Sequence, residues 1–114
     1  MDISSAKKHL RKICKSQRDQ LSCAQRDLYS DQVMAFLEAF IQAENFDQVF
    51  GYRSFGSELS VNSLIDKLSL HRCCALPRID GKLGSFQMSF HRYQAGDLLL
   101  KNAYGIEEPQ ASQF

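Results

Sequence analysis

Basic side chains gather near the start of the chain, in the stretch SSAKKHLRKICK at residues 4–15. On a helical wheel of about 100° per residue, Lys7 and Arg11 border the apolar stripe, whereas the other lysines of this stretch lie nearer the opposite face. A compact ammonium and a planar guanidinium spaced four residues apart could clamp an anion such as a phosphate. The alternative is that both side chains only cover apolar surface with their aliphatic stems. The spacing alone leaves the two interpretations open.

Glu58 is the second residue whose position could support chemistry. It lies in the stretch GYRSFGSEL, after a predicted strand and before a predicted helix. In α/β proteins, loops of this kind carry ligand-binding groups at the carboxyl ends of strands. Glu58 could therefore accept hydrogen bonds from a ligand, but a turn residue or a charge at a helix N-terminus would look the same.

Three helices are predicted to position these groups. The first runs from an N-cap at Ser4 or Ser5 to about Asp19, the second runs from Ser22 to about Ala43, and the third follows Ser60. The apolar residues at helical spacing, which we expect to face the core, are Ile3, Ala6, Leu10, Ile13 and Cys14 in the first helix, Tyr29, Val33, Phe36, Leu37 and Phe40 in the second, and Val61, Leu64, Ile65 and Leu68 in the third.

Strands are predicted at residues 47–54, at residues 73–79 with an end near Pro77, and at residues 85–93. In the last of these the alternation predicts that Phe86, Met88 and Phe90 share the inner face. The stretch RIDGKLGS reads as a loop, and the residues after the third strand contain one helical turn at most. The order of elements predicts a single domain over residues 1–114, with a layered α/β/α fold and a mostly parallel sheet.

Composition narrows the class of protein. The chain has 114 residues, 44% of them hydrophobic, and a formal net charge of +1, which argues against a surface built mainly for nucleic acid. The charge is uneven, because residues 1–26 hold seven of the 14 Lys and Arg but only two of the 13 Asp and Glu. The four cysteines match no zinc-binding spacing, and no segment reads as a signal peptide or a membrane span. We therefore expect a cytoplasmic location and no membrane partner.

Several stretches, taken in order, resemble one family, the 5-formyltetrahydrofolate cyclo-ligases, also called methenyltetrahydrofolate synthetases. The matching stretches are AKKHLRK, the R-x-x-L-S pattern at residues 18–22, GYRSFGSEL, LIDKL, LPRI, FQMSFHRY and YGIEEP. Each is weak alone, but their order and separations over nearly the whole chain make the match specific. The resemblance implies an α/β enzyme that uses ATP and Mg²⁺ to convert 5-formyltetrahydrofolate to 5,10-methenyltetrahydrofolate. In that reaction the formyl oxygen is phosphorylated, and ring closure then expels phosphate.

The resemblance also implies roles for individual residues. Lys7 and Arg11 match the pair that contacts the nucleotide, and Glu58 matches the acid that hydrogen-bonds the pterin. Arg53 stands where a residue lines the same pocket, and Tyr104 takes the place of an aromatic residue that packs on the folate. No catalytic residue and no metal ligand is assigned in this chain.

Two departures from the family pattern stand out. Arg53 replaces a residue that is usually apolar, often leucine. Family members also continue beyond the EP pair, through a strand and a glycine-rich loop similar to GxGxGYYD that cradles phosphates, and nothing after Pro109 resembles that loop. We therefore expect an incomplete fold, the N-terminal portion of a cyclo-ligase, whose C-terminal half is a possible partner. Such a portion should be weakly active or inactive alone.

A different class of function remains open. The chain could be a small non-enzymatic α/β binding module that uses its basic first helix to contact RNA or an acidic protein. In that case Lys8, Lys12 and Lys15 should contribute, and binding should weaken steeply with salt. This alternative leaves Glu58 and the YGIEEP stretch without a role.

Overall fold

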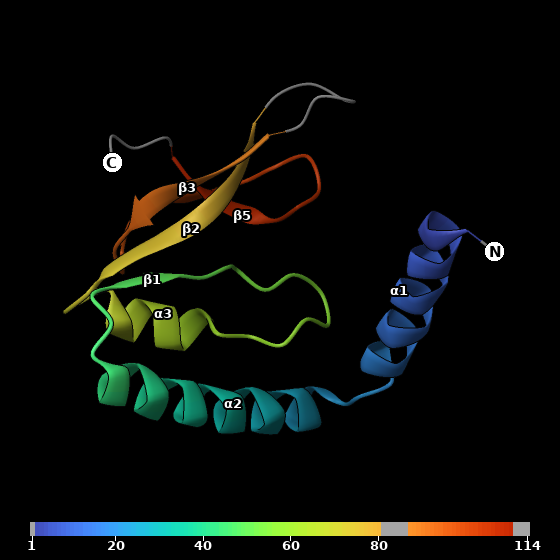
Figure 1. The fold of residues 1–114 in the computed structure, drawn as a ribbon, viewed down its shortest axis with the longest axis horizontal. Coiled ribbons are helices and arrows are strands. Elements are labelled where there is room, and N and C mark those ends of the chain that lie inside the picture. Colours follow the sequence, from blue (N-terminus) through green and yellow to red (C-terminus); the bar gives the residue numbers. More distant parts are fainter. Residues whose placement is uncertain (1, 81–86, 111–114) are drawn as a thin grey trace.

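The structure, a computed structural model, describes residues 2–80 and 87–110. Figure 1 shows α2, α3 and the strands stacked on one another, with α1 standing apart at the side. The elements, in chain order, are α1 (Ile3–Asp19), α2 (Cys23–Glu44), β1 (Gln48–Phe50), α3 (Asn62–Leu68), β2 (Cys73–Asp80), β3 (Gln87–Tyr93), β4 (Leu99–Lys101) and β5 (Glu107–Pro109).

The described strands form a three-stranded sheet in the order β1-β2-β3 and a separate β4-β5 hairpin. Strand β1 pairs with β2 in parallel, through the partners Gln48 and Cys73, whereas β3 pairs with β2 in antiparallel orientation, from Cys74 opposite Tyr93 onward. The prediction of a mostly parallel sheet is therefore wrong, although the α/β class is confirmed. The reason is that only the short stretch 81–86 separates β2 from β3, whereas a crossover between parallel strands needs a dozen residues or more, so the two paired strands run in opposite directions.

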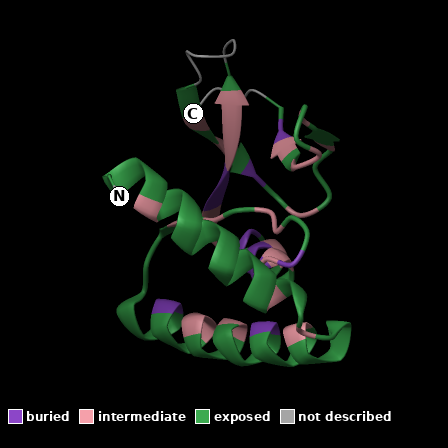
Figure 2. Cartoon of the chain, turned by 90° about the vertical axis from the view of Figure 1, so that its right-hand side faces the viewer, coloured by how far each residue is buried: buried purple, intermediate pink, exposed green. Residues whose placement is uncertain are grey.

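The core lies between the sheet and two helices. Helices α2 and α3 cover the same face of the sheet, so the described residues do not confirm an α/β/α sandwich. Figure 2 shows that buried residues gather in α3 and the adjoining strands. The buried apolar residues of this core are Ile41, Val61, Leu64, Ile65, Leu68, Cys74, Leu76 and Tyr93. All four apolar residues predicted for the third helix are among them.

Helix α2 begins as predicted but turns a different face inward. Ser22 caps it with a full capping box, in which the Gln25 side chain accepts from the Ser22 backbone N–H and the Ser22 hydroxyl accepts from the Gln25 N–H. The inner face holds Ser30, Met34, Leu37 and Ile41. Most of the predicted core stripe is exposed instead, with relative accessibilities of 46% for Tyr29, 37% for Val33, 72% for Phe36 and 48% for Phe40.

Helix α1 also departs from expectation, at its start and in its packing. Asp2, rather than a serine, is the N-cap, and its carboxylate accepts from the Ser5 N–H at 2.7 Å. No described residue of α1 is buried, and Ile3 and Leu10 are 75% and 60% exposed. The apolar stripe is present, but within the described chain no element covers it (Figure 2).

The other boundaries shift for local reasons. Helix α3 starts at Asn62 without a side-chain cap, so Ser60 is not its N-cap. Strand β2 does not end at Pro77, because β1 stops pairing at Ala75 and no strand pairs with β2 on that side at Pro77, where a proline is therefore tolerated. Of the predicted loop, residues 78–80 belong to β2, and the rest, 81–85, lies outside the described residues.

The chain beyond residue 86 also differs from the prediction. In β3 the alternation is real but reversed, since Tyr93 is buried while Met88 and Phe90 are 63% and 38% exposed; Phe86 lies outside the described residues. The final segment forms the β4-β5 hairpin, which the prediction did not include. Strands of three residues carry too little alternation to be recognised from the sequence.

Candidate functional site

A tight turn presents Glu58 beyond the carboxyl end of β1. The carboxylate oxygen Oε1 accepts from the Phe55 backbone N–H at 2.7 Å, and the Glu58 N–H donates to the Phe55 carbonyl at 3.2 Å. Gly56, between them, has φ 61°, a left-handed conformation that glycine adopts without steric cost. Residues 55–58, which we call the Glu58 turn, are thus fixed by hydrogen bonds at both ends, and they hold the half-buried carboxylate in place.

Aromatic side chains flank this carboxylate. Tyr52 donates its hydroxyl to the Leu59 carbonyl at 2.7 Å, which ties the two sides of the loop together. The pKa of Tyr52 is raised, mainly by burial and then by the negative charge of Glu58, so the two side chains are electrostatic neighbours. Phe55 stands at the tip of the loop with 49% of its surface exposed. A carboxylate beside two partly exposed rings suits a flat ligand that carries N–H donors.

The β4-β5 hairpin brings Tyr104 to the same neighbourhood. Asn102 shapes the hairpin, because its Oδ1 accepts from the Tyr104 N–H at 2.9 Å and the Ile106 N–H at 3.1 Å. Gly105, at φ 82°, packs so closely on Phe55 that an added β-carbon would lie 3.3 Å from Cε2 of that ring. The loop that carries Glu58 and the hairpin that carries Tyr104 are therefore in contact through Phe55 and Gly105. The Tyr104 residue is 55% exposed.

Arg53 points away from this group and into the body of the protein. Its Nη2 donates to Asp66 at 2.8 Å and also to the Tyr93 hydroxyl, and its guanidinium lies 4.8 Å from the centre of the Tyr93 ring. The Tyr93 hydroxyl donates to the same Asp66 oxygen at 2.6 Å. Only 9% of the Arg53 side chain is exposed. Its hydrogen bonds connect the loop after β1 to α3 and to β3.

Lys7 and Arg11 lie on α1, far along the helix from the Glu58 turn. Both are exposed, and within the described chain neither forms an ion pair or a hydrogen bond with another element. Lys15 differs, since its Nζ pairs with Asp19 at 2.7 Å. The two cations are therefore available to an anion, although the structure does not bring them into contact with Glu58 or Tyr104.

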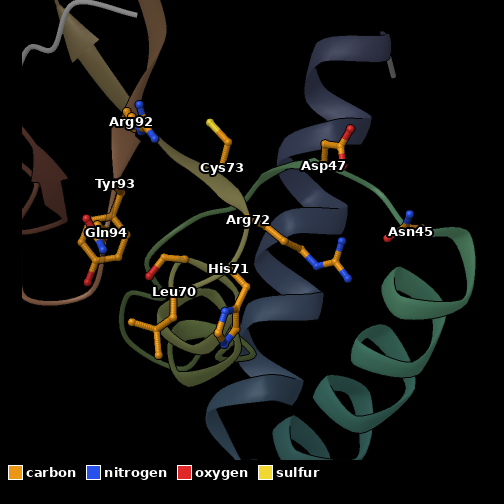
Figure 3. Close-up of a pocket in the computed structure, with 10 residues that line it drawn as sticks. Asn45, Asp47, Leu70, His71, Arg72, Cys73, Arg92, Tyr93 and Gln94 are labelled. Atoms are coloured by element: carbon orange, nitrogen blue, oxygen red, sulfur yellow. The ribbon is translucent and has the colours of Figure 1, made fainter.

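A further cavity lies at the opposite end of the sheet, where β1 and β2 begin. It has a volume of 590 Å³, and Figure 3 shows His71, Arg72 and Arg92 around it, from the segments that follow α3 and end β3. Helices α2 and α3 both end here, and Arg72 donates to the Phe46 carbonyl just after α2. Cations at helix C-termini stabilise the partial negative charge of those ends. That contact gives Arg72 a structural role without any ligand.

Metal and membrane features are absent from the described residues. Within residues 2–80 and 87–110, no group of three or more His, Cys, Asp or Glu side chains could hold a metal ion. No helix of that part of the chain combines the length and the apolar character needed to cross a bilayer.

Comparison with known proteins supports the fold through a solved structure. No family model and no curated protein sequence matches the chain. The fold, however, is similar to the NMR structure of the 5,10-methenyltetrahydrofolate synthetase of Aquifex aeolicus, with a TM-score of 0.78 and 24% identity over 94% of this chain. The chain therefore has the fold of the matching part of that structure. It spans 53% of the length of the synthetase, the extent expected for an N-terminal portion.

Reasoning from the sequence missed some residues of the site. Tyr52 and Phe55 lie in the same stretch as Glu58. Aromatic residues so near an acid could have indicated that they belong to the same site. Asn102 gave no signal, because its role depends on two backbone N–H groups that only the folded hairpin brings to it.

Proposed function

We propose that this chain carries the folate-binding part, and one nucleotide-contacting helix, of an ATP-dependent 5-formyltetrahydrofolate cyclo-ligase. The observation that carries the proposal is the likeness of nearly the whole chain to the Aquifex aeolicus synthetase structure. The arrangement around Glu58 supports it, because an acid flanked by aromatic rings lies at the carboxyl end of a strand.

On the substrate side, Glu58 binds and orients the pterin. One carboxylate oxygen is taken by the Phe55 N–H, and the other is left to accept from N–H groups of the ring. Phe55 and Tyr104 supply partly exposed ring surface against which a flat heterocycle can stack. Arg53 does not touch the ligand in this scheme; it holds the loop from behind, through Asp66.

On the nucleotide side, Lys7 and Arg11 bind phosphate oxygens. When bound, ATP supplies the phosphoryl group that turns the formyl oxygen into a leaving group. Phosphoryl transfer depends mainly on positioning and on neutralising charge, which two unpaired cations on one helix face can provide. The described residues do not supply a magnesium site, so the metal has no assigned step in this chain.

The expected activity follows from the extent of the match. Because the chain spans 53% of the synthetase, we expect it to bind ligand weakly and to turn over slowly or not at all by itself. The purified chain, mixed with 5-formyltetrahydrofolate, ATP and Mg²⁺, is followed by the absorbance of the methenyl product. Rapid turnover would contradict this expectation while supporting the family assignment.

Ligand binding tests the assignment of residues. Calorimetric titration with 5-formyltetrahydrofolate should show Glu58→Gln binding about tenfold more weakly, because a hydrogen bond to a charged group contributes about 1.5 kcal/mol or more. Glu44→Gln, at an exposed position on the last turn of α2, is the matched control and should bind like the wild type. Equal affinity of the two variants would contradict the role of Glu58.

Titration with ATP distinguishes a nucleotide clamp formed by Lys7 and Arg11 from an RNA-binding function of the first helix. Lys7→Ala and Arg11→Ala should each weaken binding, whereas Lys12→Ala, on the same exposed helix, should not. An RNA-binding module would instead lose affinity for RNA on Lys12→Ala, as on changes of Lys8 and Lys15, and with rising salt. Loss of ATP binding in Lys12→Ala to the same extent would contradict the clamp.

A further inference from the structure

Helix α1 is joined to the body through its last turn. Figure 1 shows its C-terminal end near the start of α2 and its N-terminal end away from every other element. At that last turn, Arg18 Nε donates to the Ser57 hydroxyl at 3.0 Å, and the hydroxyl in turn donates to the carboxylate of Asp19. The orientation of the helix therefore depends on a small number of polar contacts.

Ser57 is built into the protein rather than lying on its surface. It is 7% exposed, and its hydroxyl is used both as acceptor and as donor. A cavity of 210 Å³ lies beside it, lined by Arg18, Leu21, Tyr29 and Leu59 among others. Two of the residues that line this cavity, Arg18 and Ser57, form the hydrogen bond that holds the last turn of α1 to the Glu58 turn.

The same residue belongs to the turn that carries the candidate pterin ligand. Ser57 immediately precedes Glu58, inside the turn closed by the Phe55 hydrogen bonds. Lys7 lies 11 positions before Arg18, which is about 16 Å along a helix axis, so a tilt of roughly 10° at Ser57 moves Lys7 by about 3 Å. That displacement is enough to break a phosphate contact, because hydrogen bonds do not stretch by that distance.

We propose that Ser57 is a positioning residue that fixes α1, and with it Lys7 and Arg11, relative to the Glu58 turn. A ligand that binds Glu58 and restrains this turn further then also restrains the cations on α1. This second step rests on the proposed function, whereas the positioning itself does not. Ser57 touches neither ligand in this scheme and acts through Arg18 and Asp19.

The positioning is tested by the distance between two spin labels on the intact chain. One label is placed on Cys14, exposed on α1, and the other on Lys101→Cys, exposed on β4. Cys23→Ser and Cys73→Ser remove the other accessible thiols. Cys74 is buried, which raises the pKa of its thiol and leaves it unreactive.

The label distances should form a single narrow distribution in the starting protein and should lose that peak in Ser57→Ala. Asp19→Ala, at an exposed position where misfolding is not expected, should broaden the distribution in the same way, and the double variant should broaden it no further. Ser16→Ala, on the same helix, and Lys15→Ala, which removes only the ion pair with Asp19, should leave it narrow. An unchanged distribution in both Ser57→Ala and Asp19→Ala overturns the proposal.

The influence of folate binding on nucleotide binding is tested with both ligands together. Saturating 5-formyltetrahydrofolate should tighten binding of the non-hydrolysable analogue adenylyl imidodiphosphate by about fivefold or more, and Ser57→Ala should abolish that factor while it still binds the folate. Coupling that survives in Ser57→Ala overturns the transmission. Failure of the folate to bind at all contradicts the proposed function instead, and the label distances then decide the positioning by themselves.

Discussion

Removal of Asp66 should destabilise the protein much more than removal of Arg53, its partner. Asp66→Ala leaves the Arg53 guanidinium 9% exposed with no carboxylate to accept from it, and Arg53 Nε already lacks a hydrogen-bond partner among the described residues. The same change takes away the acceptor of the Tyr93 hydroxyl. Arg53→Met leaves behind only a carboxylate that is 42% exposed and still accepts from Tyr93.

The expected loss of stability in each variant depends on whether the charge left without its partner is buried or solvated. Breaking a buried ion pair costs about 3–5 kcal/mol when the remaining charge is buried. Since Asp66 is itself partly solvated, we expect the lower end, about 3 kcal/mol, for Asp66→Ala. For Arg53→Met, whose methylene packing is largely kept and whose partner can be hydrated, we expect about 1 kcal/mol.

Urea unfolding followed by far-UV circular dichroism measures both values, by linear extrapolation of the free energy of unfolding. The comparison is valid if the two variants keep the wild-type dependence on urea. A loss in Arg53→Met equal to or greater than that in Asp66→Ala would refute the reasoning. It would show that Arg53 acts through something other than its pair with Asp66.

Two further predictions concern the same core. Burial, followed by the hydrogen bond to Asp66, raises the pKa of Tyr93 from 10.0 to about 12, so its contribution to stability is fully present below pH 10 and is lost as the pH rises toward 12. The difference in unfolding free energy between wild type and Tyr93→Phe should therefore shrink over that range, and a constant difference would contradict it. Gly51→Ala should lower the free energy of unfolding, measured with heat or urea, by about 1–3 kcal/mol, because the added β-carbon would lie 2.5 Å from Ile65 Cδ1. Adding Ile65→Val, which removes that carbon, should recover part of the lost stability.

In the helices, some caps and buried faces can be predicted from the sequence pattern alone. Ser22 was identifiable as an N-cap because a capping box is a local device whose residues lie within one turn. The inner face of α3 was identifiable as well, because its apolar residues form a single narrow stripe. In α2 apolar side chains occur nearly all round the helix, so periodicity could not choose between Phe36, which is 72% exposed, and Ile41, which is buried.

The three strands of the main sheet were recognised, but their arrangement was not. Which strands pair, and in which direction, depends on contacts between residues far apart in the chain, such as Cys74 opposite Tyr93. Pro77 was misread as an end, because its tolerance depends on whether a neighbouring strand covers that edge. The strands of the β4-β5 hairpin are too short to produce a pattern.

For the candidate site, the sequence alone determined the chemistry available: a pair of cations four residues apart on a helix, an acid in a turn beside aromatic residues, and a resemblance that gave them ligands. Tertiary structure decided which of these groups meet. It joined the Glu58 turn to the Tyr104 hairpin through Phe55, turned Arg53 inward to Asp66, and linked α1 to the turn through Ser57. The physical reason is that side-chain type and local spacing are written along the chain, whereas burial and hydrogen-bond partners are set by segments that become neighbours only on folding.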